Sequence, residues 1–258
     1  MTYDYRLRQV AFVSSDLARI TAELEAVFGL RPAFHDPQVG DYGLINGVFP
    51  VGGDFIEVVQ PIAPDASAGR YLKRRGGDCG YMIILQAEDA RQHRTRLATQ
   101  GVREIEVLDF PIHFCTHFHP GDFAGVLASI DTASGVANWR EEDSAWHPAG
   151  LDWNGFRTPN SFALRAVTVQ HREPETAARI WSERLALPFA QTGGAFEIAL
   201  WRGRIRFEAP RDADGTGIVA LDIAVRSPQE TLGRAQTHGL PVRDGAVMIC
   251  GAALRPVA

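Results

Sequence analysis

Cysteine is scarce in this sequence, and long apolar runs are missing. Cys79, Cys115 and Cys250 are the three cysteines among 258 residues, and none belongs to a C-x-x-C pair. Such usage indicates reduced thiols in a cytoplasmic protein. No apolar stretch approaches the roughly 20 residues that cross a bilayer, and the start, MTYDYRLRQV, shows no export signal. We therefore expect a cytoplasmic protein with no membrane partner.

The sequence also lacks the concentrated positive charge of a nucleic-acid-binding protein. The net charge is −5, and basic residues are scattered except at Lys73–Arg75, so no nucleic-acid partner is expected. That run is interpreted as the solvated end of a helix, with a CoA-phosphate contact as the alternative. The absence of a G-x-S-x-G string and of a phosphate-binding glycine loop argues against serine-hydrolase and P-loop sites.

One carboxylate lies where an apolar residue is expected. In the stretch GGDFIEVVQP, Glu57 falls in the middle of the predicted strand Phe55–Gln60. A buried acid is costly unless it is paired or used in chemistry. Glu57 is therefore the first candidate for a functional residue.

The pattern of strands and helices predicts an α+β fold of four βαβββ units. Three predicted helices end in similar strings, FGLRP at 28–32, QGVRE at 100–104 and HGLPV at 238–242, which indicates an internal repeat. In the first unit, a short strand is expected at Arg31–Phe34. An unrelated α+β chain with ordinary glycine caps is the alternative. The first strands of the four units are predicted at Leu7–Val13, Tyr81–Leu85, Leu164–Val169 and Ile218–Val225.

The length suits two domains joined by a linker. The predicted boundaries are 1–135 for the first domain, 136–160 for the linker and 161–258 for the second domain. The linker carries Trp139, Trp146 and Trp153, while its prolines and glycines exclude one continuous helix. We interpret it as an ordered strap anchored by its tryptophans. A lid or a dimer contact is the alternative, so a homodimer stays open.

Three strings, in this order and spacing, resemble the vicinal oxygen chelate superfamily of glyoxalase I, methylmalonyl-CoA epimerase and the extradiol dioxygenases. They are RQVAFVSSDL at 8–17, FIEVVQP followed by AGRYLKRRGG at 55–77, and FHPGDFAGVLASI at 118–130. The likeness covers 6–131, whereas 162–257 match only in pattern. The resemblance implies a glyoxalase-like protein whose four units pair into two cup-shaped mixed sheets, with a metal ion that chelates the substrate.

Carried over residue by residue, the resemblance places Gln9, Glu57, Tyr81 and Ser129 at the ligand positions of the first half. Gln9 and Glu57 match the family pattern, whereas Tyr81 and Ser129 depart from it. One carboxylate and one amide form a weak donor set. A divalent ion (Zn, Ni, Co, Mn or Fe) on Gln9 and Glu57 and a metal-free site therefore both stay open. Gln9 and Ser129 are also expected to bind substrate.

The corresponding positions of the second half are Arg165, Arg206, Ala220 and Arg255, in an alignment that can slip by one residue. Guanidinium groups cannot ligate a cation, because they have no lone pair to give. Arginines facing one cavity would bind the carboxylate or phosphate of an anionic substrate. Arginines on the solvent face of the strands are the alternative.

The string HFCTHFH at 113–119 places His113, Cys115, His117 and His119 on one face of a strand. Histidine titrates near neutral pH and, like cysteine, ligates transition metals. A polar wall of the cup is one interpretation. A proton-transfer or replacement-ligand role for His113 or His117 is the other, and Cys115 is expected to be a buried, inert thiol.

Three functions follow as hypotheses. The first is an isomerase or lyase of the glyoxalase and epimerase type, which removes a proton next to a carbonyl of a small anionic substrate, a carboxylate or an acyl-CoA. Its catalytic residues would be Glu57 as base, Tyr81 as donor to the enolate oxygen, and His113 and His117. The second is a non-catalytic small-molecule-binding protein of the same fold. A ring-cleaving dioxygenase is third, because its ligand set of two histidines and one carboxylate is not found at the expected places.

Overall fold

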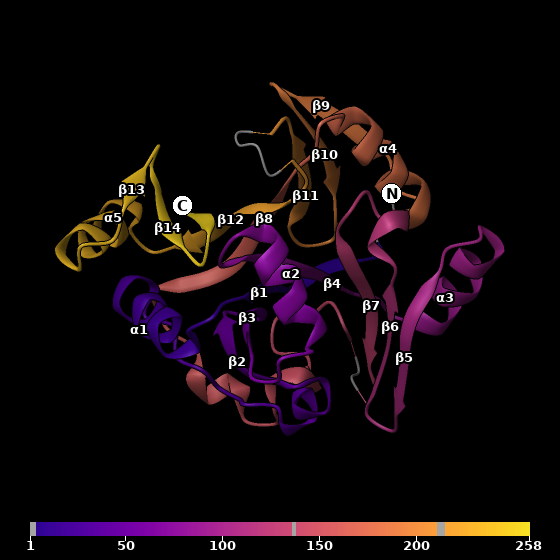
Figure 1. Cartoon of the computed structure of the whole chain (residues 1–258), viewed down its shortest axis with the longest axis horizontal. Coiled ribbons are helices and arrows are strands. Elements are labelled where there is room, and N and C mark those ends of the chain that lie inside the picture. The colour runs from indigo at the N-terminus through magenta and orange to yellow at the C-terminus, as the bar shows by residue number, and fades with distance from the viewer. Residues whose placement is uncertain (1–3, 136–137, 211–214) are drawn as a thin grey trace.

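Two mixed sheets built on the same plan form the protein. The structure is a computed structural model that describes residues 4–135, 138–210 and 215–258, so the first two residues of the predicted linker lie outside it. In the first sheet, β1 and β4 run antiparallel at the centre, and each has the last strand of its unit beside it in parallel. In the second sheet, β8 and β12 are arranged in the same way. Figure 1 shows the two sheets with their helices.

The first sheet has seven strands in the order β2-β3-β1-β4-β7-β6-β5. The strands and helices of this half are β1 (Arg6–Val13), α1 (Leu17–Phe28), β2 (Leu44–Val51), β3 (Asp54–Pro61), α2 (Ser67–Arg75), β4 (Cys79–Gln86), α3 (Ala90–Thr99), β5 (Glu104–Phe110), β6 (His113–Phe118) and β7 (Leu127–Ala133).

The second sheet has eight strands in the order β13-β14-β15-β12-β8-β11-β10-β9. Among the described residues, no helix is both long and apolar enough to span a bilayer. The elements of this half are β8 (Ser161–Gln170), α4 (Pro174–Leu185), β9 (Phe189–Thr192), β10 (Ala195–Ala199), β11 (Arg204–Glu208), β12 (Gly217–Val225), α5 (Pro228–Thr237), β13 (Val242–Arg243), β14 (Ala246–Ile249) and β15 (Ala252–Val257).

The first unit departs from the predicted pattern, because Arg31–Phe34 is not a strand. Only Phe34 forms a single bridge, with Val48 of β2. Pro32 has no N–H to contribute to a ladder, so the segment pairs too briefly to count as a strand. The other three units carry the full set of strands, and the predicted α+β fold with two mixed open sheets is confirmed.

One apolar core joins the helix-bearing sides of the two sheets. Buried residues of β1, β4, β8 and β12 belong to the same cluster as those of the helices. Helices α1 and α5 pack against each other, and Arg234 Nε donates to the carbonyl oxygen of Val27 at 2.8 Å. The sheets approach where a Cβ added to Gly80 of β4 would lie 2.4 Å from Cβ of Ile218 in β12. The opposite, concave faces are therefore left for other contacts.

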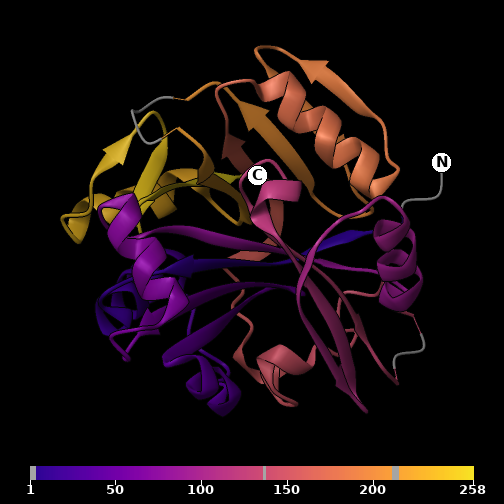
Figure 2. The ribbon, with the colours of Figure 1, turned by 45° about the vertical axis from the view of Figure 1, so that its right-hand side comes forward.

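The linker covers the concave face of the first sheet (Figure 2). Trp146 and Trp153 are 1% and 2% exposed and belong to an apolar cluster with residues of β1 to β4. The linker also packs closely against the turn between β2 and β3. A Cβ added to Gly53 in this turn would lie only 2.0 Å from the carbonyl oxygen of Glu142, so the turn has no room for a side chain there. We call residues 138–160 the strap. Trp146 and Trp153 anchor it to the sheet.

A buried ion pair connects the strap to both sheets. Arg6 of β1 donates from Nε and Nη2 to Asp54 Oδ1 at 3.0 and 2.8 Å, and both side chains are fully buried. Arg6 Nη1 donates to the carbonyl oxygen of Glu141 in the strap at 2.8 Å. Asp54 Oδ2 accepts the backbone N–H of Leu164 in β8 at 3.0 Å. Three separate parts of the chain thus depend on one carboxylate.

We predict that Asp54→Asn lowers the free energy of unfolding by about 3–5 kcal/mol, because it leaves the Arg6 guanidinium buried without its counter-charge. Urea unfolding followed by circular dichroism measures the change. Asp109→Asn is the matched control, since Asp109 pairs with Arg91 on the surface, where ion pairs contribute little. Equal unfolding midpoints for wild type and Asp54→Asn would contradict the structural role of the buried pair.

Candidate functional site

The concave face of the first sheet gathers two neighbouring groups of polar side chains beneath the strap. The Glu57 group consists of Gln9, Asn46, Glu57 and Tyr81, from β1 to β4. The donor cluster consists of His113, Cys115 and Asp131, from β6 and β7. Strand pairing connects the two groups across the sheet, because Gln9 faces Ile84, Ile84 faces Ser129, and Ser129 faces His117. The predicted first-half residues therefore share one face.

Glu57 is buried and both of its oxygens accept hydrogen bonds. Gln9 Nε2 donates to Oε2 at 2.8 Å, and Asn46 Nδ2 donates to Oε1 at 2.7 Å. Burial raises the pKa of the Glu57 carboxyl above its usual value, and the bonds from Asn46 and Gln9 offset part of that rise. The environment thus makes Glu57 a stronger proton acceptor than an exposed glutamate.

The two amides are turned toward Glu57 by partners that can only donate. Trp146 Nε1 lies 2.7 Å from Gln9 Oε1, and the backbone N–H of Asp36 lies 2.8 Å from Asn46 Oδ1. Because indole and backbone N–H groups have no acceptor function, each amide must present its oxygen to them. The NH₂ groups of Gln9 and Asn46 therefore face the carboxylate.

Tyr81 of β4 and His117 of β6 interact electrostatically with Glu57. Burial, and then the negative charge of Glu57, raise the pKa of Tyr81, so its phenol stays protonated at neutral pH. His117 favours the ionised form of Glu57 electrostatically and so lowers its pKa. His117 Nδ1 lies 3.4 Å from Glu106 Oε2 of β5, and this contact holds the pKa of Glu106 below its usual range. The imidazole of His117, paired with the Glu106 carboxylate, therefore lies next to the Glu57 group.

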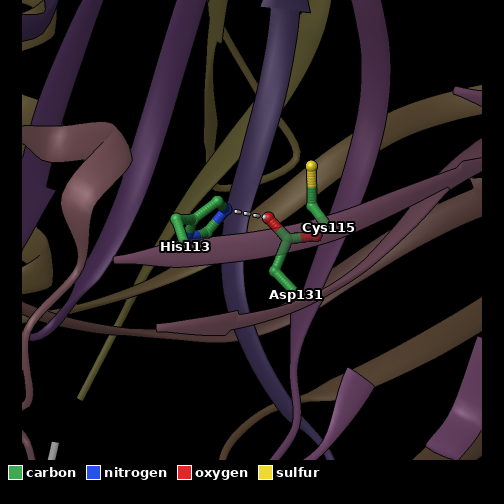
Figure 3. Close-up of side chains that lie close together, drawn as sticks. All are labelled: His113, Cys115 and Asp131. Carbon is green, nitrogen blue, oxygen red and sulfur yellow. Dashed lines mark hydrogen bonds and ion pairs between the residues drawn. The ribbon is translucent and has the colours of Figure 1, made fainter. Parts of the chain in front are cut away.

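The donor cluster lies on β6 and β7 (Figure 3). His113 Nε2 is 3.0 Å from Asp131 Oδ2, and the ring of His113 meets that of Trp146 edge-on at 5.3 Å. Ser129 Oγ donates to Asp131 Oδ1. Burial raises the pKa of the Cys115 thiol, so the sulfur is protonated at neutral pH. Ser129 is therefore a partner of Asp131 rather than part of the Glu57 group.

The metal site that the resemblance implies does not fit the residues around Glu57. A cation needs lone pairs, but Gln9 turns its oxygen to Trp146 and presents an NH₂ group to Glu57. Met82 and Ile84 of β4 belong to the apolar cluster of the concave face and offer no hard donor. A chelate centre on Gln9 and Glu57 would require both amide networks to break.

In the second sheet, two of the three predicted arginines, Arg206 and Arg255, are already paired with acids. Arg206 Nη1 and Arg255 Nη1 lie 3.0 and 3.1 Å from the two oxygens of Asp222 on β12. Arg206 Nε also lies 2.8 Å from Glu197 of β10. Arg206 and Arg255 do converge on one face, but the acids beside them balance their charge.

The alignment of the second half slips by one residue at Arg165. Arg165 is exposed and is skipped by the pairing of β8 with β12. Arg8 of β1 is skipped in the same way by the pairing with β4. Such a bulge adds one residue to a strand, so Arg165 corresponds to Arg8, and Ala166 rather than Arg165 corresponds to Gln9.

The sequence pattern does not reveal Arg8 itself as part of the site. Its side chain is fully buried, and its guanidinium lies 5.2 to 5.8 Å from the ring centres of Phe55, Trp146 and Trp153. Nη2 donates to the carbonyl oxygen of Ser144 at 2.6 Å. Burial lowers the pKa of Arg8 well below its usual value. The sequence pattern also does not reveal the roles of Asn46, Asp131 and Trp146 in the site, because these roles depend on contacts with residues distant in the sequence.

A cavity of about 480 Å³ lies between α2 and the second half. Tyr71 and three arginines, Arg74, Arg75 and Arg172, line it. The ring of Tyr71 lies 5.5 Å from that of Tyr81, so the cavity adjoins the Glu57 group. The basic run of α2 thus borders a cavity, in addition to ending a helix.

Comparisons with known proteins bear on the fold. No family model and no curated protein sequence matches the chain. A mutant of 4-hydroxymandelate synthase from Streptomyces coelicolor is similar in structure, with a TM-score of 0.69 and 17% identity over 93% of this chain and 76% of that one. The Mn(II)-bound glyoxalase from Novosphingobium aromaticivorans gives a TM-score of 0.67 and 12% identity over 99% and 82% of the two chains.

A mutant of methylmalonyl-CoA epimerase from Streptomyces coelicolor, in complex with 2-nitronate-propionyl-CoA, covers 52% of this chain and 100% of its own, with a TM-score of 0.47 and 17% identity. The first two likenesses cover nearly all of this chain and, together with the paired βαβββ-type units described above, establish the architecture. The chain has the fold of the vicinal oxygen chelate superfamily.

Proposed function

We propose that the protein is an isomerase or lyase that removes a proton next to the carbonyl of a small anionic substrate, with Glu57 as the base. The observation that carries this proposal is the environment of Glu57: burial raises its pKa, while two oriented amides bond its oxygens. A general base works best when its pKa approaches the working pH. An exposed glutamate would be too weak a base.

The neighbours of Glu57 have complementary roles in this proposal. Tyr81, whose phenol stays protonated, donates to the enolate oxygen that develops as the proton leaves. Gln9 has a second N–H for the substrate oxygen, since one of its two donates to Glu57. His117, with Glu106 behind it, returns the proton to the product side. Trp146 and Trp153 of the strap exclude water from the closed site.

The arginine-lined cavity supports an anionic substrate. Arg74, Arg75 and Arg172 border it, and guanidinium groups bind carboxylates and phosphates through several hydrogen bonds. Tyr71, which lines the cavity, packs against Tyr81 of the Glu57 group. In an acyl-CoA substrate, the phosphates would occupy the cavity while the acyl group reaches Glu57.

We expect Glu57→Gln to slow proton exchange by about 10²–10⁴-fold, the usual contribution of a general base. Purified protein is incubated in D₂O with a panel of 2-oxo acids, 2-hydroxy acids and acyl-CoA thioesters, and loss of the α-proton signal is followed by NMR. Glu175→Gln is the control, because Glu175 pairs with Arg179 on the surface of α4.

Two results would oppose this proposal. Exchange by Glu57→Gln at the wild-type rate would exclude Glu57 as the base. A compound from the panel that binds tightly and is recovered without exchange would favour the small-molecule-binding function instead.

The pH dependence follows from the raised pKa of Glu57. A base acts only when ionised, so kcat/KM should rise with pH and level off above the pKa of Glu57. Because that pKa is raised, the rise should lie above the pH of about 4.3 expected for an ordinary glutamate. A rate profile that is flat from pH 4 upward would contradict the assignment.

Trp146→Phe should move that rise to higher pH by about one unit. Without the indole N–H, the Gln9 amide is free to turn its oxygen toward Glu57, and a hydrogen bond to a charged group contributes about 1.5–3 kcal/mol. Trp153→Phe is the matched control, because the ring of Trp153 packs edge-on against Phe55 at 5.0 Å. An unchanged profile in Trp146→Phe, or an equal shift in both variants, would contradict the orienting role of Trp146.

A further inference from the structure

We propose that His113, Cys115 and Asp131 form a binding site for a divalent transition-metal ion such as Zn²⁺ or Co²⁺. This site uses donors on β6 and β7, and none of the three is among the positions Gln9, Glu57, Tyr81 and Ser129 where the resemblance places a metal ligand. One ligand atom from each residue lies within 4.8 Å of the other two. The three residues are 7%, 3% and 3% exposed.

The pairing of two strands brings the donors together. Cys115 and Asp131 face each other across β6 and β7, and His113 faces Ala133 one step along the same face. His113 Nε2 and Asp131 Oδ2 are already 3.0 Å apart, close to the spacing of two ligands on one tetrahedral ion with bonds of about 2.0–2.1 Å. Figure 3 shows His113 beside Asp131, with Cys115 on the same strand as His113 and Asp131 on the neighbouring strand.

The surroundings of Asp131 and His113 favour a ligand role. Ser129 Oγ donates to Asp131 Oδ1, which leaves Oδ2 for the cluster, and ligating carboxylates usually have such an outer hydrogen bond. His113 Nδ1 is buried and has no hydrogen-bond partner among the described residues. Nε2, which lies 3.0 Å from Asp131 Oδ2, is the ring nitrogen of His113 that faces the cluster.

The chemistry of the donors selects the ion. Thiolate and imidazole prefer borderline transition metals to Mg²⁺ or Ca²⁺. Binding replaces the proton on Cys115 Sγ with the metal, and the proton of neutral His113 moves from Nε2 to Nδ1, so one proton is released for each divalent ion bound. The thiolate and the Asp131 carboxylate then balance the two positive charges, as a buried ion requires.

Titration of the full-length, reduced protein with Co²⁺ tests the site. We expect one equivalent to bind with a thiolate-to-cobalt charge-transfer band in the near ultraviolet. Cys115→Ser should lose the band, while Cys250→Ser should keep it, because Cys250 is a buried thiol outside the cluster. Ser129→Ala should weaken binding by about 10–100-fold, the usual effect of an outer-shell partner.

Absence of the band in the wild type, or its persistence in Cys115→Ser, would overturn the proposal. Loss of the band in Cys250→Ser would do the same, because it would assign the ligand to another cysteine. Circular dichroism of Cys115→Ser checks that the variant is folded. Glu57→Gln should bind Co²⁺ as the wild type does, so the metal site and the proton-transfer function are tested separately.

Discussion

The hydrogen bond from Trp146 Nε1 to Gln9 Oε1 determines what the concave face can do. Because the indole N–H only donates, the bond directs the NH₂ group of Gln9 toward Glu57. The Glu57 carboxylate therefore accepts hydrogen bonds from the amides of Gln9 and Asn46 and does not ligate a metal ion together with Gln9. The same ring packs against His113, so one side chain of the strap contacts both the Glu57 group and the donor cluster.

The strap can hold Trp146 in place only because its own backbone is fixed. Arg6 binds the carbonyl oxygen of Glu141 while it pairs with Asp54, and Arg8 binds that of Ser144. Both guanidinium groups are buried, and a buried charge without partners costs several kcal/mol. The stability of the fold and the orientation of the site therefore depend on the same few contacts between β1 and the strap.

Much of the fold could be predicted from the sequence, because local signals determine it. Asp16 and Ser227 cap the helices α1 and α5, and the repeated helix ends indicate the four units. The short pairing at Phe34 was not predictable from alternation alone, since Pro32 limits the ladder. The position of Arg165 was missed because a bulge shifts the register without a clear signal in the sequence.

The site was predictable in part. Glu57 stands out because an acid interrupts an apolar strand, and strand period places His113 and Cys115 on one face. Their partners Asn46 and Asp131 come from other strands and emerge only from pairing. The central claim is that burial raises the pKa of Glu57 despite its two amide donors. Carbon-13 NMR titration of the Glu57 carboxyl, assigned with Glu57→Gln, tests it most directly: we predict a pKa above the usual value of about 4.3, and a pKa at or below that value would contradict the account.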